Sequence, residues 1–177
     1  MSSRVARRYA RALLDLAADH DQLEAWGLEL ERIARLVASP EVGPRLTSPE
    51  IPEQARVQAM QRIGERLGLS YPLQSFAVVL ARHRRIGEAP AVALAYQDLL
   101  DERLGRARAT ITFAAQPSDD ATARVVAGLE KMAGKQIIAT FNADPALLGG
   151  VVAQLEGITY DASLASRLEA LRRRLGE

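Results

Sequence analysis

The sequence contains no cysteine, few aromatic residues and only two histidines. The absence of cysteine excludes disulfides, thiol catalysis and thiolate metal sites, and it is compatible with a reducing compartment. Aromatic residues make up 5% of the 177 residues, so the core has to be built mainly from leucine, valine, isoleucine and alanine. Because alanine and leucine are the strongest helix formers, this composition favours helices.

Long hydrophobic runs and a strong net charge are also missing. The longest apolar stretch, FAVVLA at 76–81, is far shorter than the roughly 20 residues of a membrane span. The formal net charge is +1, which gives no case for a broad nucleic-acid footprint. Hydrophobic residues at 48% and charged residues at 25% are an ordinary globular mix, enough for one good-sized core or two small domains.

Basic residues are nonetheless clustered in three places along the chain. The clusters are Arg4, Arg7, Arg8 and Arg11; Arg82, Arg84 and Arg85; and Arg172, Arg173 and Arg174. Such runs are typical of solvated helix faces and of helix C-terminal turns, where cations suit the helix dipole. The alternative is a module that binds RNA or a membrane surface through these patches.

The N-terminus is basic and amphipathic, which is also typical of an organellar transit peptide. However, Val5, Tyr9, Ala12, Leu13 and Leu16 fall on one helical face that continues into the rest of the chain. We therefore interpret this segment as the first helix of a mature bacterial-type protein.

Residues up to about 105 show helical periodicity throughout. Helices are expected at 4–19, 22–38, 52–67, 71–84 and 87–104, with a weaker one at 41–46. The segment 22–38, for example, places Leu23, Trp26, Leu30, Ile33 and Val37 at spacings of three and four. Proline and glycine mark the boundaries, and Ser70 is the expected cap of the helix at 71–84. The sequence predicts an N-terminal six-helix bundle over residues 1–105.

The period then changes from 3.6 to 2, which indicates a small α+β domain over residues 106–177. In 106–113, small and apolar residues alternate with arginine and threonine, as in a half-buried strand. Further strands are expected at 136–143, 151–155 and 158–160, and a helix at 119–133. Glu156–Gly157 is a two-residue hairpin turn, Gly149–Gly150 introduces a strand, and Asp161 or Ser163 caps a final amphipathic helix.

No arrangement of residues points to catalysis, so the sequence predicts a protein that is not an enzyme. His20 and His83 lie in different helices and form no metal-ligand pair, and Gly149–Gly150 lacks the pattern of a phosphate loop. Asp98, Asp101 and Glu102 form an acidic cluster, for which a salt bridge to an arginine is the favoured interpretation. We expect no metal and no cofactor.

The helix at 71–84 is apolar on more than one side. Leu73, Phe76, Ala77 and Leu80 point to one face, whereas Val78, Val79 and Ala81 are left over. Such a helix is either the central helix of the bundle or one wall of a groove that accepts an amphipathic partner helix. The sequence leaves both readings open.

Three segments in the right order resemble the ATP synthase delta subunit family, which includes the oligomycin-sensitivity-conferring protein. They are ARRYARALLDLA at 6–17, AYQDLLDERLGRARATITFA at 95–114, and DPALLGGVV with YDAS-x3-RLEAL at 144–171. One departure is visible: such proteins usually place glycine directly after the third strand, where this chain has Glu156 and then Gly157. This departure changes the expected turn type rather than the implied role.

The resemblance implies a peripheral-stalk (stator) subunit of the F-type ATP synthase, present in one copy per complex at the cytoplasmic face of the bacterial membrane. It implies that the helical domain holds the N-terminal helix of an alpha subunit and that the C-terminal domain holds the end of the b-subunit stalk. No nucleic-acid partner is implied. The candidate residues for the alpha helix are Tyr9, Ala12, Leu13, Leu16, Phe76, Val79, Leu80 and His83. Those for the b stalk are Arg167, Arg172, Arg173 and Arg174.

Overall fold

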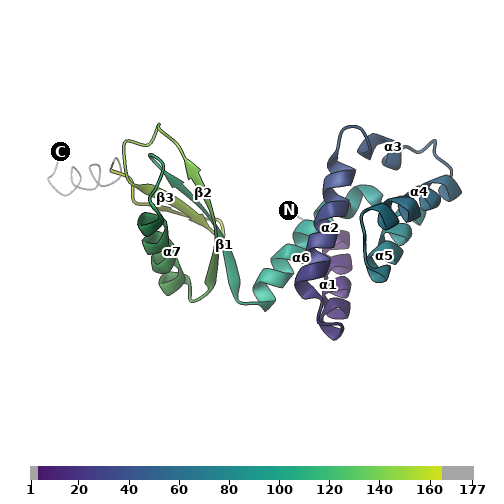
Figure 1. Cartoon of the computed structure of the whole chain (residues 1–177), viewed down its shortest axis with the longest axis horizontal. Coiled ribbons are helices and arrows are strands. Elements are labelled where there is room, and N and C mark those ends of the chain that lie inside the picture. Colours follow the sequence, from purple (N-terminus) through teal and green to yellow (C-terminus); the bar gives the residue numbers. More distant parts are fainter. Residues whose placement is uncertain (1–3, 165–177) are drawn as a thin grey trace. The chain divides into compact units, whose positions relative to one another are not determined.

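The computed structural model describes residues 4–164 and is drawn in Figure 1. The chain divides into two compact units, residues 1–100 and residues 101–177. The chain is mainly helical with a small C-terminal sheet, as predicted. Within the described residues, no helix is both long and apolar enough to cross a membrane.

The first unit is built from helices. They are α1 (Arg4–Asp19), α2 (Leu23–Ala38), α3 (Gly43–Thr47), α4 (Glu53–Arg66), α5 (Tyr71–Arg82), the 3-10 helix η1 (Ile86–Glu88) and α6 (Ala89–Arg103). Helix α3 has only five residues, and η1 is a separate short turn. The unit is therefore helical, as predicted, but it is not clearly a bundle of six helices. The predicted helix at 71–84 ends at Arg82, and the one at 87–104 starts after η1.

The core of this unit follows the predicted apolar faces. The buried residues of α2 are Trp26, Gly27, Leu30, Ile33 and Val37. In α6 the buried residues recur at helical spacing; they are Ala89, Val92, Ala93, Tyr96, Leu99 and Leu100. Apart from Gly27, these residues belong to one continuous hydrophobic cluster that also includes residues of α1 and α5. Helical periodicity was therefore sufficient to predict which faces form the core.

The hydrogen bonds of Ser70, the residue before α5, differ from those expected from the sequence. Ser70 precedes α5, but its side chain makes no capping hydrogen bond to that helix. Its backbone N–H and hydroxyl both donate to the Glu29 carboxylate of α2, each at 2.8 Å. Ser70 thus occupies the N-cap position of α5, as predicted, but its hydroxyl makes no capping hydrogen bond and instead donates to the charged carboxylate of Glu29.

The second unit contains a four-stranded sheet and one helix. The strands are β1 (Arg106–Phe113), β2 (Gln136–Ala143), β3 (Val151–Leu155) and β4 (Ile158–Asp161), and the helix is α7 (Asp119–Ala133). The strand order is β2-β1-β3-β4, with β1 parallel to β2 and antiparallel to β3. Helix α7 connects the two parallel strands, as such pairs require.

Alternation along β1 sets the small core of this unit. Ala107, Ala109, Ile111 and Phe113 are buried, and α7 contributes Leu129 to the same cluster. Ser118 caps α7 by accepting a hydrogen bond from the Ala121 N–H, and Gly134 ends the helix at φ 66°. The alternation predicted for 106–113 is confirmed.

The β3–β4 hairpin turns at Glu156 and Gly157, as predicted. Both residues have positive φ, 50° and 83°, as in the type I′ turns that match the twist of a hairpin. Glutamate is unusual at such a position, and its carboxylate lies against the Lys135 ammonium. The shifted glycine therefore retains a two-residue turn and places a non-glycine residue at its first position.

The unit boundary lies inside α6, between Leu100 and Asp101. Separate domains at 1–105 and 106–177 stay a prediction. Asp161 accepts a hydrogen bond from the Ser163 N–H at 2.8 Å, but the final helix expected beyond this point lies outside the described residues.

Candidate functional site

The described residues do not bring titratable side chains together in the manner of an active site. No group of three or more histidine, aspartate or glutamate side chains within residues 4–164 is placed to hold a metal ion. His20 lies beside the Trp26 ring, with centroids 6.2 Å apart, and His83 is exposed at the end of α5.

The acidic cluster near the end of α6 includes one ion pair. The Asp101 carboxylate accepts a hydrogen bond from Arg108 Nε at 2.5 Å, and Asp101 is largely buried. Residue 101 lies at the C-terminal end of the helix, where a negative charge is unfavourable, so the arginine on β1 offsets that cost. The prediction of a salt bridge to an arginine is confirmed for Asp101.

Apolar side chains of α1 and α5 meet at the surface of the first unit. The Tyr9 and Phe76 rings pack edge to face, with centroids 5.9 Å apart. Ala12 and Leu16 follow Tyr9 on the same face of α1, and Val79 follows Phe76 on α5. We name Tyr9, Ala12, Leu16, Phe76 and Val79 the α1–α5 apolar surface.

This surface is partly open to solvent. Leu16 is 49% exposed and Val79 is 40% exposed, whereas Phe76 is almost fully buried. On α1 these residues lie between the buried face, formed by Ala6, Ala10, Leu13, Leu14 and Ala17, and an arginine-rich face. The apolar part of α1 is therefore wider than its core contact requires, which is typical of a helix that also contacts a partner.

Charged and polar groups border the α1–α5 apolar surface. The Arg8 guanidinium lies 5.7 Å from the centroid of the Tyr9 ring, within the range of a cation–π contact. His83, the residue after α5, is exposed. An apolar centre with a cationic edge can accept an amphipathic helix whose polar side carries carboxylates.

The structure divides the predicted alpha-helix contacts into two groups. Leu13, Phe76 and Leu80 are buried in the core. Tyr9, Ala12, Leu16, Val79 and His83 retain exposed area. The residues predicted for the b stalk, Arg167, Arg172, Arg173 and Arg174, lie outside the described residues.

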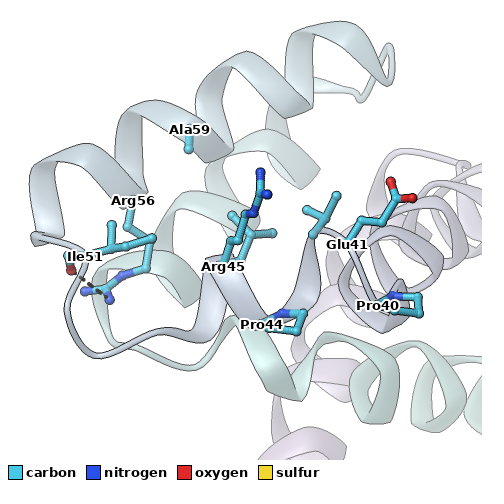
Figure 2. Close-up of a pocket in the computed structure, with 9 residues that line it drawn as sticks. Pro40, Glu41, Pro44, Arg45, Ile51, Arg56 and Ala59 are labelled. Atoms are coloured by element: carbon cyan, nitrogen blue, oxygen red, sulfur yellow. Dashed lines mark hydrogen bonds between the residues drawn. The ribbon is translucent and has the colours of Figure 1, made fainter.

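Two hollows in the first unit were not predicted from the sequence. One, of about 420 Å³, lies between α2 and α6, and its lining includes Ala34, Ala38, Ala93 and the exposed Leu94. The other, of about 600 Å³, lies beside α3 and α4 and is drawn in Figure 2. No sequence signal identifies either hollow, because each is formed by helices whose packing the periodicity does not specify.

Comparisons with known proteins agree on one family. The sequence model of the ATP synthase delta (OSCP) subunit matches residues 5–175. The ATP synthase subunit delta of Anaeromyxobacter dehalogenans (strain 2CP-C) is 36% identical over 173 residues, covering 97% of this chain and 96% of the relative. That of Syntrophobacter fumaroxidans is 33% identical over 165 residues, covering 93% and 90%.

A solved structure shares the fold over almost the whole chain. It is a chain of the Toxoplasma gondii mitochondrial ATP synthase hexamer, with a TM-score of 0.68, 22% identity and 98% coverage of both chains. At this identity the likeness shows the fold alone, whereas the matches in sequence are long enough to show the family. The chain therefore belongs to the ATP synthase delta (OSCP) subunit family.

Proposed function

We propose that this protein is a non-catalytic, peripheral-stalk subunit of the F-type ATP synthase, which connects the catalytic head to the stator. Family membership supports the assignment to the complex. In this role the protein would act at the cytoplasmic face of the bacterial membrane, in one copy per complex, and would resist the torque of the rotor so that rotation drives ATP synthesis. Such a role requires tight contacts and stiffness, and it requires no reactive group.

The N-terminal helix of an alpha subunit is the proposed occupant of the α1–α5 apolar surface. The single observation that carries this proposal is that Leu16 and Val79 are 49% and 40% exposed on adjoining helices. Since about half of each side chain is already buried, covering the remainder stabilises a complex by about 0.7–1.5 kcal/mol per residue. Nanomolar affinity corresponds to about 12 kcal/mol, so several apolar anchors are needed once the entropy cost of association is included.

The contact with the b subunit is proposed for the C-terminal part of the chain, residues 106–177, which we propose to be a separate domain. The arginines Arg167, Arg172, Arg173 and Arg174 are its candidate contacts, since a charged stalk helix would present carboxylates to them. With the alpha helix on residues 1–105 and the b stalk on residues 106–177, the chain forms the link between head and stalk.

The test of the alpha contact is a calorimetric titration of the full chain with a peptide that copies the N-terminal helix of the alpha subunit from the same organism. Replacing an exposed apolar anchor by aspartate, in Leu16→Asp or Val79→Asp, leaves an unpaired charge under the bound helix. We expect each variant to bind about 30- to 100-fold more weakly, which corresponds to a loss of about 2–3 kcal/mol.

The matched control is Leu94→Asp, because Leu94 is an exposed leucine on α6 that lies outside the α1–α5 apolar surface. This control should bind the peptide with wild-type affinity. Absence of binding by the wild type at micromolar peptide, or equal losses in all three variants, would contradict the proposal. Tight binding of RNA or anionic vesicles with a steep salt dependence would instead favour the basic-patch alternative.

A further inference from the structure

Arg56 of α4 is a buried cation that has no anionic partner among the described residues. The residue is only 2% exposed, and within residues 4–164 no carboxylate lies within 4.0 Å of its nitrogens. Burying a guanidinium is costly unless its N–H groups find acceptors. The guanidinium stays buried despite this desolvation cost. The acceptors of its hydrogen bonds therefore indicate the role of the side chain.

Two backbone carbonyls accept hydrogen bonds from Arg56. Nε donates to the Ala81 carbonyl at 2.8 Å, and Nη1 donates to the Ile51 carbonyl at 3.4 Å, whereas Nη2 has no acceptor in the described structure. Ala81 lies in the last turn of α5, and Ile51 lies in the loop before α4. One side chain thus connects this loop to the C-terminal end of α5.

The loop contacting Arg56 has little packing behind it on one side. The hollow in Figure 2 separates this loop and α3 from α4, and its apolar lining includes Val42, Leu46, Ile51 and Ala59. In the same view Arg56 lies beside Ile51, while the Arg45 and Glu41 side chains extend from the opposite side. With a hollow in place of packed side chains, the hydrogen bonds of Arg56 become the specific restraint on this end of the unit.

The Ala81 carbonyl is also the acceptor that ends α5. It accepts from the Arg84 N–H at 3.2 Å, while the Leu80 carbonyl accepts from the Arg85 N–H at 2.8 Å. Arg84 has a φ of 56°, so this pair of bonds is the reversal that often ends a helix. The same turn determines the positions of Val79 and His83, since the His83 N–H donates to the Val79 carbonyl at 3.1 Å.

We propose that Arg56 is a positioning residue for the partner helix: it fixes the last turn of α5 and thereby the Val79 end of the α1–α5 apolar surface. The inference rests on the proposed function, because it concerns the affinity of that surface. It differs from a role in stability. An apolar side chain of similar length loses the two hydrogen bonds but also removes the cost of burying the guanidinium and its unpaired Nη2, so we expect the two effects on stability to offset each other.

The experiment compares full-length wild type, Arg56→Met and Arg56→Lys in peptide affinity and in urea unfolding. Arg56→Met should retain the urea midpoint and bind the alpha peptide about tenfold more weakly, the equivalent of about 1.4 kcal/mol. Arg56→Lys retains a cation but has a single donor nitrogen, so it holds one carbonyl and should bind with intermediate affinity. Arg62→Met, an exposed arginine of the same helix, is the matched control and should bind like the wild type.

A second control separates positioning from a general loss of stability. Met60→Ala creates a cavity in the core of the same helix without changing the Ala81 carbonyl, so it should unfold at lower urea and bind normally below its transition. If a folded Arg56→Met or Arg56→Lys variant binds the peptide with wild-type affinity, the inference is overturned. An equal loss of affinity in Met60→Ala also overturns it. Failure of the wild type to bind the peptide overturns the proposed function instead.

Discussion

Replacing Tyr96 by phenylalanine tests a polar contact between two helices of the first unit. Tyr96 is 0% exposed, and its hydroxyl donates to the Leu23 carbonyl at 2.8 Å, which connects α6 to the start of α2. Because Leu23 is the first residue of α2, its carbonyl is also in position to accept an N–H one helical turn later, so it is not left without a donor. At neutral pH the variant should therefore lose about 1 kcal/mol, the net value of one hydrogen bond.

The effect of the substitution should reverse at high pH. Desolvation by burial raises the pKa of Tyr96 from 10.0 to about 12. Between these values the folded state binds more protons than the unfolded state, so stability falls as the pH rises. The loss amounts to about 1.4 kcal/mol at about pH 11 and to about 2.7 kcal/mol once the pH exceeds both values. Phenylalanine cannot ionise, so the variant becomes the more stable protein above about pH 11.

The assay is urea unfolding monitored by the fluorescence of Trp26, the single tryptophan, which is buried in the same core cluster as Tyr96. The free energies of unfolding of wild type and Tyr96→Phe are compared at pH 7 and across pH 10–12, where effects of other groups are common to both proteins. Tyr71→Phe is the matched control, because Tyr71 is exposed and should stay within about 0.5 kcal/mol of the wild type throughout. A difference that is the same at pH 7 and pH 11.5 refutes the reasoning.

Two substitutions test backbone turns: one introduces a glycine at a positive φ and should stabilise the protein, and the other removes a glycine and should destabilise it. Arg84 follows α5 with a φ of 56°, so Arg84→Gly removes the strain of a non-glycine residue in the left-handed region. The variant should have a free energy of unfolding about 0.5–1 kcal/mol higher than the wild type in urea titrations. A free energy of unfolding below that of the wild type contradicts the strain argument. Gly150 has a φ of 87°, and an added Cβ would lie 2.5 Å from the Ala162 carbonyl oxygen. Gly150→Ala should therefore destabilise the sheet unit by about 2–4 kcal/mol, seen as faster amide exchange in β3 and β4, whereas unchanged exchange there argues against the close approach.

Some features of this fold follow from local sequence alone. Helical spacing in α2 placed Trp26 and Ile33 in the core, and alternation in β1 placed Ile111 and Phe113 on the covered face. The hairpin turn at Glu156–Gly157 needed only the positions of its flanking strands. These signals are reliable because each depends on neighbouring residues in the sequence, or on the regular spacing of apolar residues that any helix or strand with one buried face must have.

Other features depend on residues that are far apart in the sequence. Arg56 has the sequence context of an ordinary surface arginine in the first turn of a helix, yet its acceptors lie at Ile51 and, 25 residues away, at Ala81. Likewise, the hydroxyl of Ser70 bonds to Glu29 rather than to its own helix. Hydrogen-bond partners at such separations are chosen by how the helices pack, which no local pattern encodes.

The sequence by itself determined the helical and sheet parts, their core faces and the family to which the chain belongs. Only the tertiary structure decided which of the predicted partner residues are accessible: Leu13 and Leu80 are in the core, whereas Leu16 and Val79 stay partly exposed. The physical reason is that periodicity fixes the direction of a side chain from its own helix, whereas the neighbouring helices decide whether that side chain is covered.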